Sequence, residues 1–360
     1  MFEFNRRDLS IQNKERNSSF ELLRIFCIFG IVFMHSLSHV WLDRRFIFLS
    51  VAENSLFNIG VTVFILISGY FGVTLSVKKI LYIEALAIFG GILNLLMTFI
   101  RGEEFGFFFI IYNIFPIVSR QYWFLTCYVC LILLSPLLNH LVVSLPQKHL
   151  LYLNLLLIIL FYVCPTFFYY EITPDSGKGL LNMITVYFLG RYLKLYPINR
   201  KRRFWMFLGI VFYGVTFLAN FAFLIFTSRV ELPYTRDNSF FVLGLAVSVF
   251  LLFEKESYIS NPINKAAKYV LPVYVYNHLV LKYFLPQNTA ERLLSVNIPK
   301  GAFYIVLNVL LAILICVVIE FLRSLIFSPI EKRLFPWLER RITDVVKRAA
   351  EFCCEKLNIE

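Results

Sequence analysis

Arg24 and His35 stand out because both lie inside the otherwise apolar segment LLRIFCIFGIVFMHSLSHVW (23–42). Eleven helical steps of about 100° bring the two side chains within roughly 20° of one face, about 16 Å apart along the axis. Ionisable groups inside apolar spans are costly and usually mark substrate paths. A guanidinium suits a phosphate, and an imidazole deeper on the same face can take a proton from a hydroxyl. The pair therefore fits acyl transfer, with Arg24 holding the phosphates of an acyl-CoA and His35 activating the hydroxyl that attacks the thioester.

Both residues also have structural interpretations. Arg24 could reach the inner interface and pair with Glu21, and His35 could be a neutral imidazole hydrogen-bonded to a neighbouring helix. Ser18 and Glu21 match a capping box, which predicts that the helix begins near residue 19. A metal site made with His39 would need acidic or cysteine ligands that are absent nearby in the sequence, so we expect no metal.

The composition places the chain in a membrane. Of its 360 residues, 59% are hydrophobic and 16% charged, whereas charged residues make up about 25% of a soluble domain. The first 18 residues are too polar for a signal peptide, so the first apolar run is expected to be retained. Spanning segments must satisfy their own backbone, which predicts an all-α polytopic bundle. Runs near the required length of about 20 residues predict about ten spans, at 19–40, 56–74, 78–100, 122–143, 149–164, 180–195, 204–227, 239–254, 266–284 and 301–326.

Lysine and arginine set the predicted orientation. If both termini are cytoplasmic, most basic residues fall inside, including NRKRRF (199–204). The net charge of +12 is then a signal for topology and anionic lipid, and no nucleic acid is implied. We predict a cytoplasmic segment at 1–18, a membrane domain at 19–327 and a basic amphipathic tail at 328–360 lying on the inner leaflet of a cell inner or plasma membrane.

Several motifs in order resemble the membrane acyltransferase 3 family. Arginine and histidine separated by ten residues are followed by GVTVFILISGYFGV (60–73) and YWFLTCYVCLILLSPLLN (122–139). YFLGRYLKLY (187–196) and YVYNHLVL (274–281) continue the pattern, so the resemblance covers nearly the whole chain. It implies a bundle of helices that moves acyl groups, most often acetyl from acetyl-CoA, onto sugars of surface polysaccharides, lipid-linked glycans or small molecules.

The resemblance also implies roles for individual residues. His35 becomes the catalytic base and Arg24 its partner on the donor side. Many members carry Arg-x-x-Arg early in the third span, where this chain has VKKILYIE (77–84). Glu84 lies within that span and is expected to pair with a cation such as Arg24. The other predicted residues are Ser68, Lys78, Lys79 and Arg191 for the donor, and Glu84, Trp123, Tyr276, Asn277 and His278 for support or the acceptor side.

The sequence thus predicts an integral membrane O-acetyltransferase. Its donor substrate would be acetyl-CoA, and its acceptor a sugar hydroxyl of a surface polysaccharide or lipid-linked glycan. Membrane lipids and glycan-assembly proteins are the other expected partners. One alternative is a transporter or flippase of a lipid-linked glycan, which discontinuous helices and internal repeats would favour; we detect no clear repeat. Another is a structural partner in a glycan-assembly complex.

Overall fold

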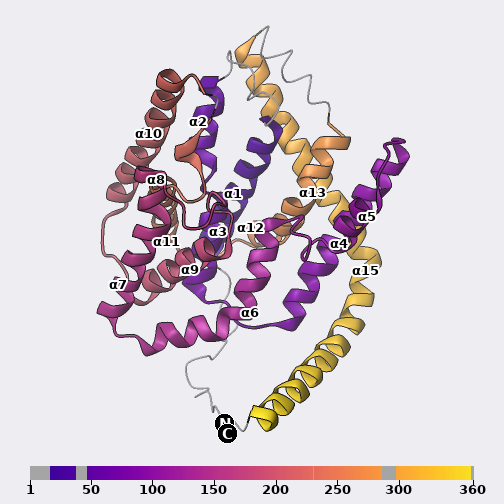
Figure 1. Ribbon diagram of the computed structural model, residues 1–360. Helices are drawn as coiled ribbons and strands as arrows, with labels where there is room; N and C mark the ends of the chain where they lie inside the picture. The colour runs from indigo at the N-terminus through magenta and orange to yellow at the C-terminus, as the bar shows by residue number, and fades with distance from the viewer. Residues whose placement is uncertain (1–16, 38–46, 230, 286–296, 358–360) are drawn as a thin grey trace.

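The computed structural model describes residues 17–37, 47–229, 231–285 and 297–357. Every regular element within these ranges is a helix, and the helices pack side by side into one bundle (Figure 1). Eight helical segments are long and apolar enough to cross a membrane. The predicted all-α membrane bundle is therefore confirmed.

The segments long enough to span include both continuous and broken helices. Five are single helices: α1 (Ser18–Leu37), α4 (Val77–Ile100), α6 (Trp123–Ser144), α10 (Arg202–Thr227) and α15 (Ile298–Leu357). Three are composite: α2 (Ile47–Phe57) with α3 (Gly60–Phe71); α7 (Gln147–Ile158) with the π-helix η4 (Ile159–Val163) and α8 (Cys164–Phe168); and η5 (Pro233–Thr235) with α11 (Phe240–Glu254).

Two further predicted spans coincide with shorter helices. They are α9 (Leu180–Leu195) and α13 (Val270–Tyr283), which follows α12 (Asn261–Ala266) and the 3₁₀ turn η6 (Ala267–Tyr269). Their 16 and 14 residues fall short of the length that a membrane needs, about 20 residues. The predicted total of about ten spans therefore stays a prediction.

The second span begins earlier than predicted. Residues 47–57 were expected to lie mostly in a loop, but they form α2. Its polar side chains Glu53 and Asn54 lowered the apparent hydropathy, yet both are buried inside the protein. Asn54 donates to the carbonyl of Ser50 in the same helix at 2.9 Å. The polarity thus reflects protein contacts rather than a water-exposed loop.

Two other boundaries differ from prediction, and one short helix was not predicted. The fifth span extends to Phe168 through a π turn next to Pro165, because proline cannot donate the regular helical hydrogen bond. The short helix α5 (Phe107–Ile114) was not predicted at all, since its eight residues are too few for a span. Helix α15 continues without a break past residue 327 and through Pro329, so the predicted tail is an extension of the last helix.

The start of α1 is fixed by tertiary contacts rather than by the predicted capping box. The Asn17 side chain accepts from the Ser19 amide at 3.0 Å. Ser18 instead uses its hydroxyl to donate to Asn264 at 2.9 Å, and its amide donates to the carbonyl of Tyr258 at 2.8 Å. The capping box was therefore wrong, although the predicted start of the helix was right.

The connections at the two ends of the bundle fall into two groups. Ser18 at the start of α1 bonds the α11–α12 connection, and Lys255 in that connection donates to Ile198 between α9 and α10 at 3.3 Å. We call this the inner end, because the charge pattern predicts that it faces the cytoplasm. At the opposite, outer end, three bonds join other connections: Arg101 to Tyr283, Arg120 to Lys178 and Asn182 to Asp237.

Helices α3 and α9 approach each other closely through two glycines. A Cβ on Gly69 would overlap the backbone carbonyl of Tyr187 and lie 3.1 Å from the Cα of Gly190. The neighbours are backbone atoms, which cannot rotate away as a flexible side chain could. Small residues thus let these two backbones meet, as is common in membrane bundles.

We predict that Gly69→Ala destabilises the bundle. Overpacking typically costs about 1–3 kcal/mol, which should appear as a lower melting temperature of the detergent-solubilised protein. Gly214→Ala on α10 is the matched control, because nothing lies within 4 Å of a Cβ at that position. Equal melting temperatures for the two variants would contradict the inferred close contact.

Candidate active site

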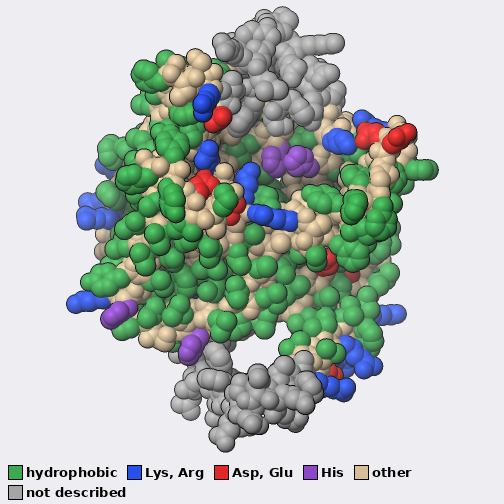
Figure 2. Space-filling model, viewed as in Figure 1, with side chains coloured by type: hydrophobic (Ala, Val, Ile, Leu, Met, Phe, Trp, Pro, Cys, Tyr) green, Lys and Arg blue, Asp and Glu red, His purple; other side chains and the backbone are tan. Residues whose placement is uncertain are grey.

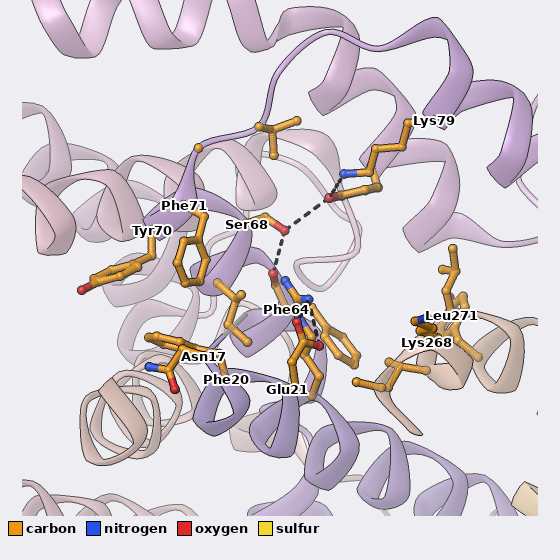
Figure 3. Close-up of a pocket in the computed structure, with 18 of the residues that line it drawn as sticks. Asn17, Phe20, Glu21, Phe64, Ser68, Tyr70, Phe71, Lys79, Lys268 and Leu271 are labelled. Carbon is orange, nitrogen blue, oxygen red and sulfur yellow. Dashed lines mark hydrogen bonds and ion pairs between the residues drawn. The ribbon is translucent and has the colours of Figure 1, made fainter. Parts of the chain in front are cut away.

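A cavity of about 1030 Å³, which we call the donor chamber, reaches the inner end of the bundle. Its wall includes Asn17 before α1, Ser257 after α11 and Lys268 in the 3₁₀ turn before α13. Figure 3 shows side chains from several helices pointing into it. Its charged lining residues are Arg24, Lys79, Lys194 and Lys268, together with Glu21 and Glu254.

Arg24 lies in the wall of this chamber and pairs with Glu21. Its Nη1 atom is 3.1 Å and 3.3 Å from the two carboxylate oxygens. Glu21 is only 5% exposed, so the pair neutralises a buried carboxylate. The expected pairing of Arg24 with Glu84 was wrong within the described residues, because α1 supplies the partner one turn away. Glu84 is half-buried on α4 and lines neither the donor chamber nor the cavity beside Lys78.

The remaining charges leave the donor chamber cationic. Glu254 accepts a hydrogen bond from Tyr70 at 3.2 Å and lies 3.7 Å from Lys255. With both carboxylates engaged by neighbouring groups, Lys79, Lys194 and Lys268 give the chamber a positive potential. Such a cavity suits a polyanion, and lysine ammonium groups bind phosphate as point charges.

A hydrogen-bonded chain crosses the donor chamber between α4, α6 and α3. Lys79 donates to the Tyr128 hydroxyl at 3.0 Å, and that hydroxyl lies 3.4 Å from Ser68. Ser68 in turn donates to the carbonyl of Phe64 at 2.9 Å, as the dashed lines in Figure 3 trace. Two predicted donor residues, Ser68 and Lys79, are thus brought together with Arg24 in one cavity.

His35 lies beyond the deep end of the donor chamber and is not part of its lining. Its Nδ1 atom is 2.6 Å from Oδ1 of Asn277 on α13. Asn277 uses its amide nitrogen to donate to the carbonyls of Val273 at 3.1 Å and Tyr274 at 2.6 Å. This pair of bonds fixes Oδ1 as the acceptor, so Nδ1 of His35 carries the proton. In the neutral ring the basic lone pair is then on Nε2.

His278 packs against His35. The two ring centroids are 4.8 Å apart with planes inclined by 34°. His278 is exposed and His35 half-buried. Figure 2 shows such a touching pair of histidines in a hollow of the surface, beside acidic and basic side chains. The structure thus joins three predicted residues, His35, Asn277 and His278, into one polar cluster.

Lys78 and Arg191, two predicted donor residues, lie outside the donor chamber. Lys78 lines a neighbouring cavity of about 420 Å³ together with Lys332 of α15. Arg191 stands behind the chamber wall, where a Cβ on Gly72 would lie 3.0 Å from its Nη1 atom.

Trp123 and Tyr276, predicted to support the site, contact other side chains. Trp123 begins α6 and contacts Phe124, with ring centroids 6.2 Å apart. Tyr276 is fully buried and donates to Glu320 of α15 at 3.1 Å. It adjoins Asn277 in sequence but points to a different neighbour.

Sequence reasoning missed residues that shape the donor chamber. Tyr128, Phe124 and Tyr274 lie within quoted motifs, yet their aromatic character fitted a lipid-facing or core position equally well. Lys194 and Lys268 were assigned to topology alone. They come from α6, α9, η6 and α13, and only the packing of the whole bundle brings them to one cavity.

Residues 17–317 match the family model described as an acyltransferase domain, that of acyltransferase 3. The match covers most of the 360 residues. The chain belongs to the acyltransferase 3 family. No curated protein matches this chain, and no solved structure does.

All site residues of this acyltransferase 3 protein fall inside the matched region. The match ends within α15, before a buried ion cluster in the same helix. In that cluster Arg323 donates to Glu320 at 2.8 Å and to Glu331 at 2.5 Å. The family pattern therefore includes both the donor chamber and His35, whereas the extension of α15 lies outside it.

We predict that Asn277→Ala slows acyl transfer by about 10-fold to 100-fold. Without Oδ1 of Asn277, the imidazole of His35 can take the other tautomer and rotate. A general base typically raises the rate by about 10²–10⁴-fold, and we expect His35 to keep part of that contribution. The rate should be measured beside the tautomer of His35, followed by ¹⁵N NMR. Asn154→Ala is the control, since Asn154 is buried on α7 and bonds only its own helix in the described structure. An unchanged tautomer and rate would contradict the positioning role.

Proposed function

We propose that this protein transfers an acetyl group from acetyl-CoA to a sugar hydroxyl of a surface polysaccharide or lipid-linked glycan. The donor would enter the chamber from the cytoplasmic side of an inner or plasma membrane. The acceptor would meet His35 from the outer end. One observation carries the proposal: Tyr274 lines the donor chamber, and one turn further along α13 Asn277 holds His35.

The charges favour a CoA thioester over a simple acyl donor. The adenosine phosphates would lie against Lys194 and Lys268, which belong to the chamber wall. The pantetheine arm is flexible and carries amides, for which Ser68 and Tyr128 offer hydroxyl partners. The thioester would then stand at the deep end, and Arg24 would contribute a rigid, planar cation at the mouth.

The proposed reaction uses His35 as a general base. Nε2 takes the proton of the acceptor hydroxyl while its oxygen attacks the thioester carbonyl. The carbon–oxygen bond forms, the carbon–sulfur bond breaks, and CoA leaves as a thiolate into the donor chamber. The imidazolium that results still donates through Nδ1 to Asn277, which stabilises its charge.

A transporter of a lipid-linked glycan is a second candidate, favoured by one observation. The broken helix formed by α12, η6 and α13 lines the chamber through Ala267, Lys268 and Val270. Broken helices that border a cavity are common at transporter binding sites. An acyltransferase makes a covalent bond to the glycan and a transporter does not. Transfer of a labelled acetyl group to the glycan therefore distinguishes the two candidates.

We predict that His35→Ala abolishes transfer from labelled acetyl-CoA to a crude surface-glycan acceptor in lipid vesicles. His149→Ala is the control, because His149 is exposed on α7. The melting temperatures of both variants should match that of the native protein. If the native protein neither transfers the label nor binds or hydrolyses acetyl-CoA, the enzyme is ruled out, and movement of labelled glycan across the vesicle is the next assay.

We predict that Arg24→Ala raises the KM for acetyl-CoA more than it lowers kcat. A hydrogen bond to a charged group contributes about 1.5–3 kcal/mol, equivalent to roughly 10-fold to 150-fold. Arg24→Lys should recover part of the loss by keeping the charge and the pairing with Glu21. Arg202→Ala serves as the control, since Arg202 forms an exposed ion pair with Glu256. A KM that stays at the native value would remove Arg24 from the donor site.

A further inference from the structure

Three aromatic side chains are, each on its own helix, the lining residues farthest from the inner end of the donor chamber. They are Phe64 of α3, Phe124 of α6 and Tyr274 of α13, and all three belong to the chamber lining. We call them the aromatic partition. His35 is outside the lining, while Asn277, its partner, bonds the carbonyl of Tyr274. The aromatic partition therefore stands between the proposed position of the thioester and the proposed base.

Phe124 is the central ring of the aromatic partition. It is 7% exposed, and its centroid lies 6.2 Å from Phe64 and 5.3 Å from Tyr274. On its other side it stacks on Tyr128 at 5.8 Å with nearly parallel planes. Phe124 thus contacts rings from α3, from α13 and from its own helix, α6.

Tyr274 is held through its ring and through its backbone. Its ring packs edge-on against Phe124 of α6, with centroids 5.3 Å apart, and its carbonyl accepts from Asn277 at 2.6 Å. Moving this ring would break its packing against α6, and shifting its backbone would disturb the residue that orients His35. The aromatic partition is therefore coupled to the catalytic geometry and is expensive to displace.

We infer that the aromatic partition sets the length of the acyl group, and that Phe124 is the residue that excludes chains longer than acetyl. The inference rests on the proposed function. When the thioester carbonyl approaches His35, whatever extends beyond the carbonyl must share the space of these rings. Close-packed interiors do not absorb added methylenes without strain. A methyl group needs little room, whereas a propyl chain would displace Phe124.

The test compares acetyl-CoA with butyryl-CoA as donors for the native protein and for Phe124→Ala. A single methylene can change kcat/KM by about 10-fold to 200-fold. The kcat/KM of the native protein should therefore be at least about tenfold higher with acetyl-CoA than with butyryl-CoA. Phe124→Ala removes the ring and should bring the ratio of the two kcat/KM values close to one or reverse it. Phe71→Ala is the matched control: Phe71 lines the same chamber but is 55% exposed, so its removal should leave the ratio unchanged.

Each outcome bears on the inference. Equal use of both donors by the native protein overturns it, as does a Phe124→Ala variant that keeps acetyl transfer without gaining butyryl transfer. If Phe124→Ala has a lower melting temperature or no activity, two other variants replace it: Phe124→Leu, which loses less packing, and Phe64→Ala, which removes a different ring. An acetyl-to-butyryl ratio of kcat/KM that stays at the native value in both variants overturns the inference. Failure of the native protein with every donor defeats the proposed function, whereas acetyl transfer with an unaltered preference defeats only this inference.

Discussion

The structure depends on the constraint that an ionisable or polar group inside an apolar bundle needs a partner within the protein. Arg24 meets this constraint through Glu21, and His35 does so through Asn277. Leaving a buried polar group without a partner costs about 1–3 kcal/mol, and more for a charge. Glu21 lies on α1 itself, whereas the bond from His35 to Asn277 requires α1 to pack against α13. The same bonds that satisfy the constraint also fix the orientation of the groups that chemistry would use.

Helix α1 is long enough to contribute a residue to both parts of the proposed site, the donor chamber and the histidine cluster. Arg24 lies in the wall of the donor chamber, while His35 joins the cluster beyond the aromatic partition. Between them the same face carries Ile28 and Ile31, which are 3% and 5% exposed. A packed apolar stretch thus separates the charged mouth from the base. An acyl group reaching His35 would pass buried hydrocarbon rather than water, which would protect a thioester from hydrolysis.

Much of the fold could be predicted from sequence, because apolar runs of spanning length are a strong local signal. The shared face of Arg24 and His35 also follows from helix geometry, and the family match covers both. The sequence left both Glu21 and Glu84 as partners of Arg24, since choosing between the two carboxylates requires knowing which helices touch, and the structure shows Glu21. The helical residues 47–57 were missed for a related reason: Glu53 and Asn54 are polar but buried, and composition cannot tell a protein-facing polar group from a water-facing one.

The lysines that stand where many family members carry Arg-x-x-Arg show how packing assigns different tasks to adjacent residues. Lys79 lines both the donor chamber, where it donates to Tyr128, and the cavity beside α15, whereas Lys78 lines only the second of these two cavities. Lysine offers a compact charge and lacks the planar fork with which arginine grips a phosphate at two points. One lysine therefore replaces a guanidinium poorly by itself. Lys194 and Lys268 line the same chamber, so the positive potential is spread over several helices, and the donor would be held by the shape and charge of the whole cavity rather than by a single motif.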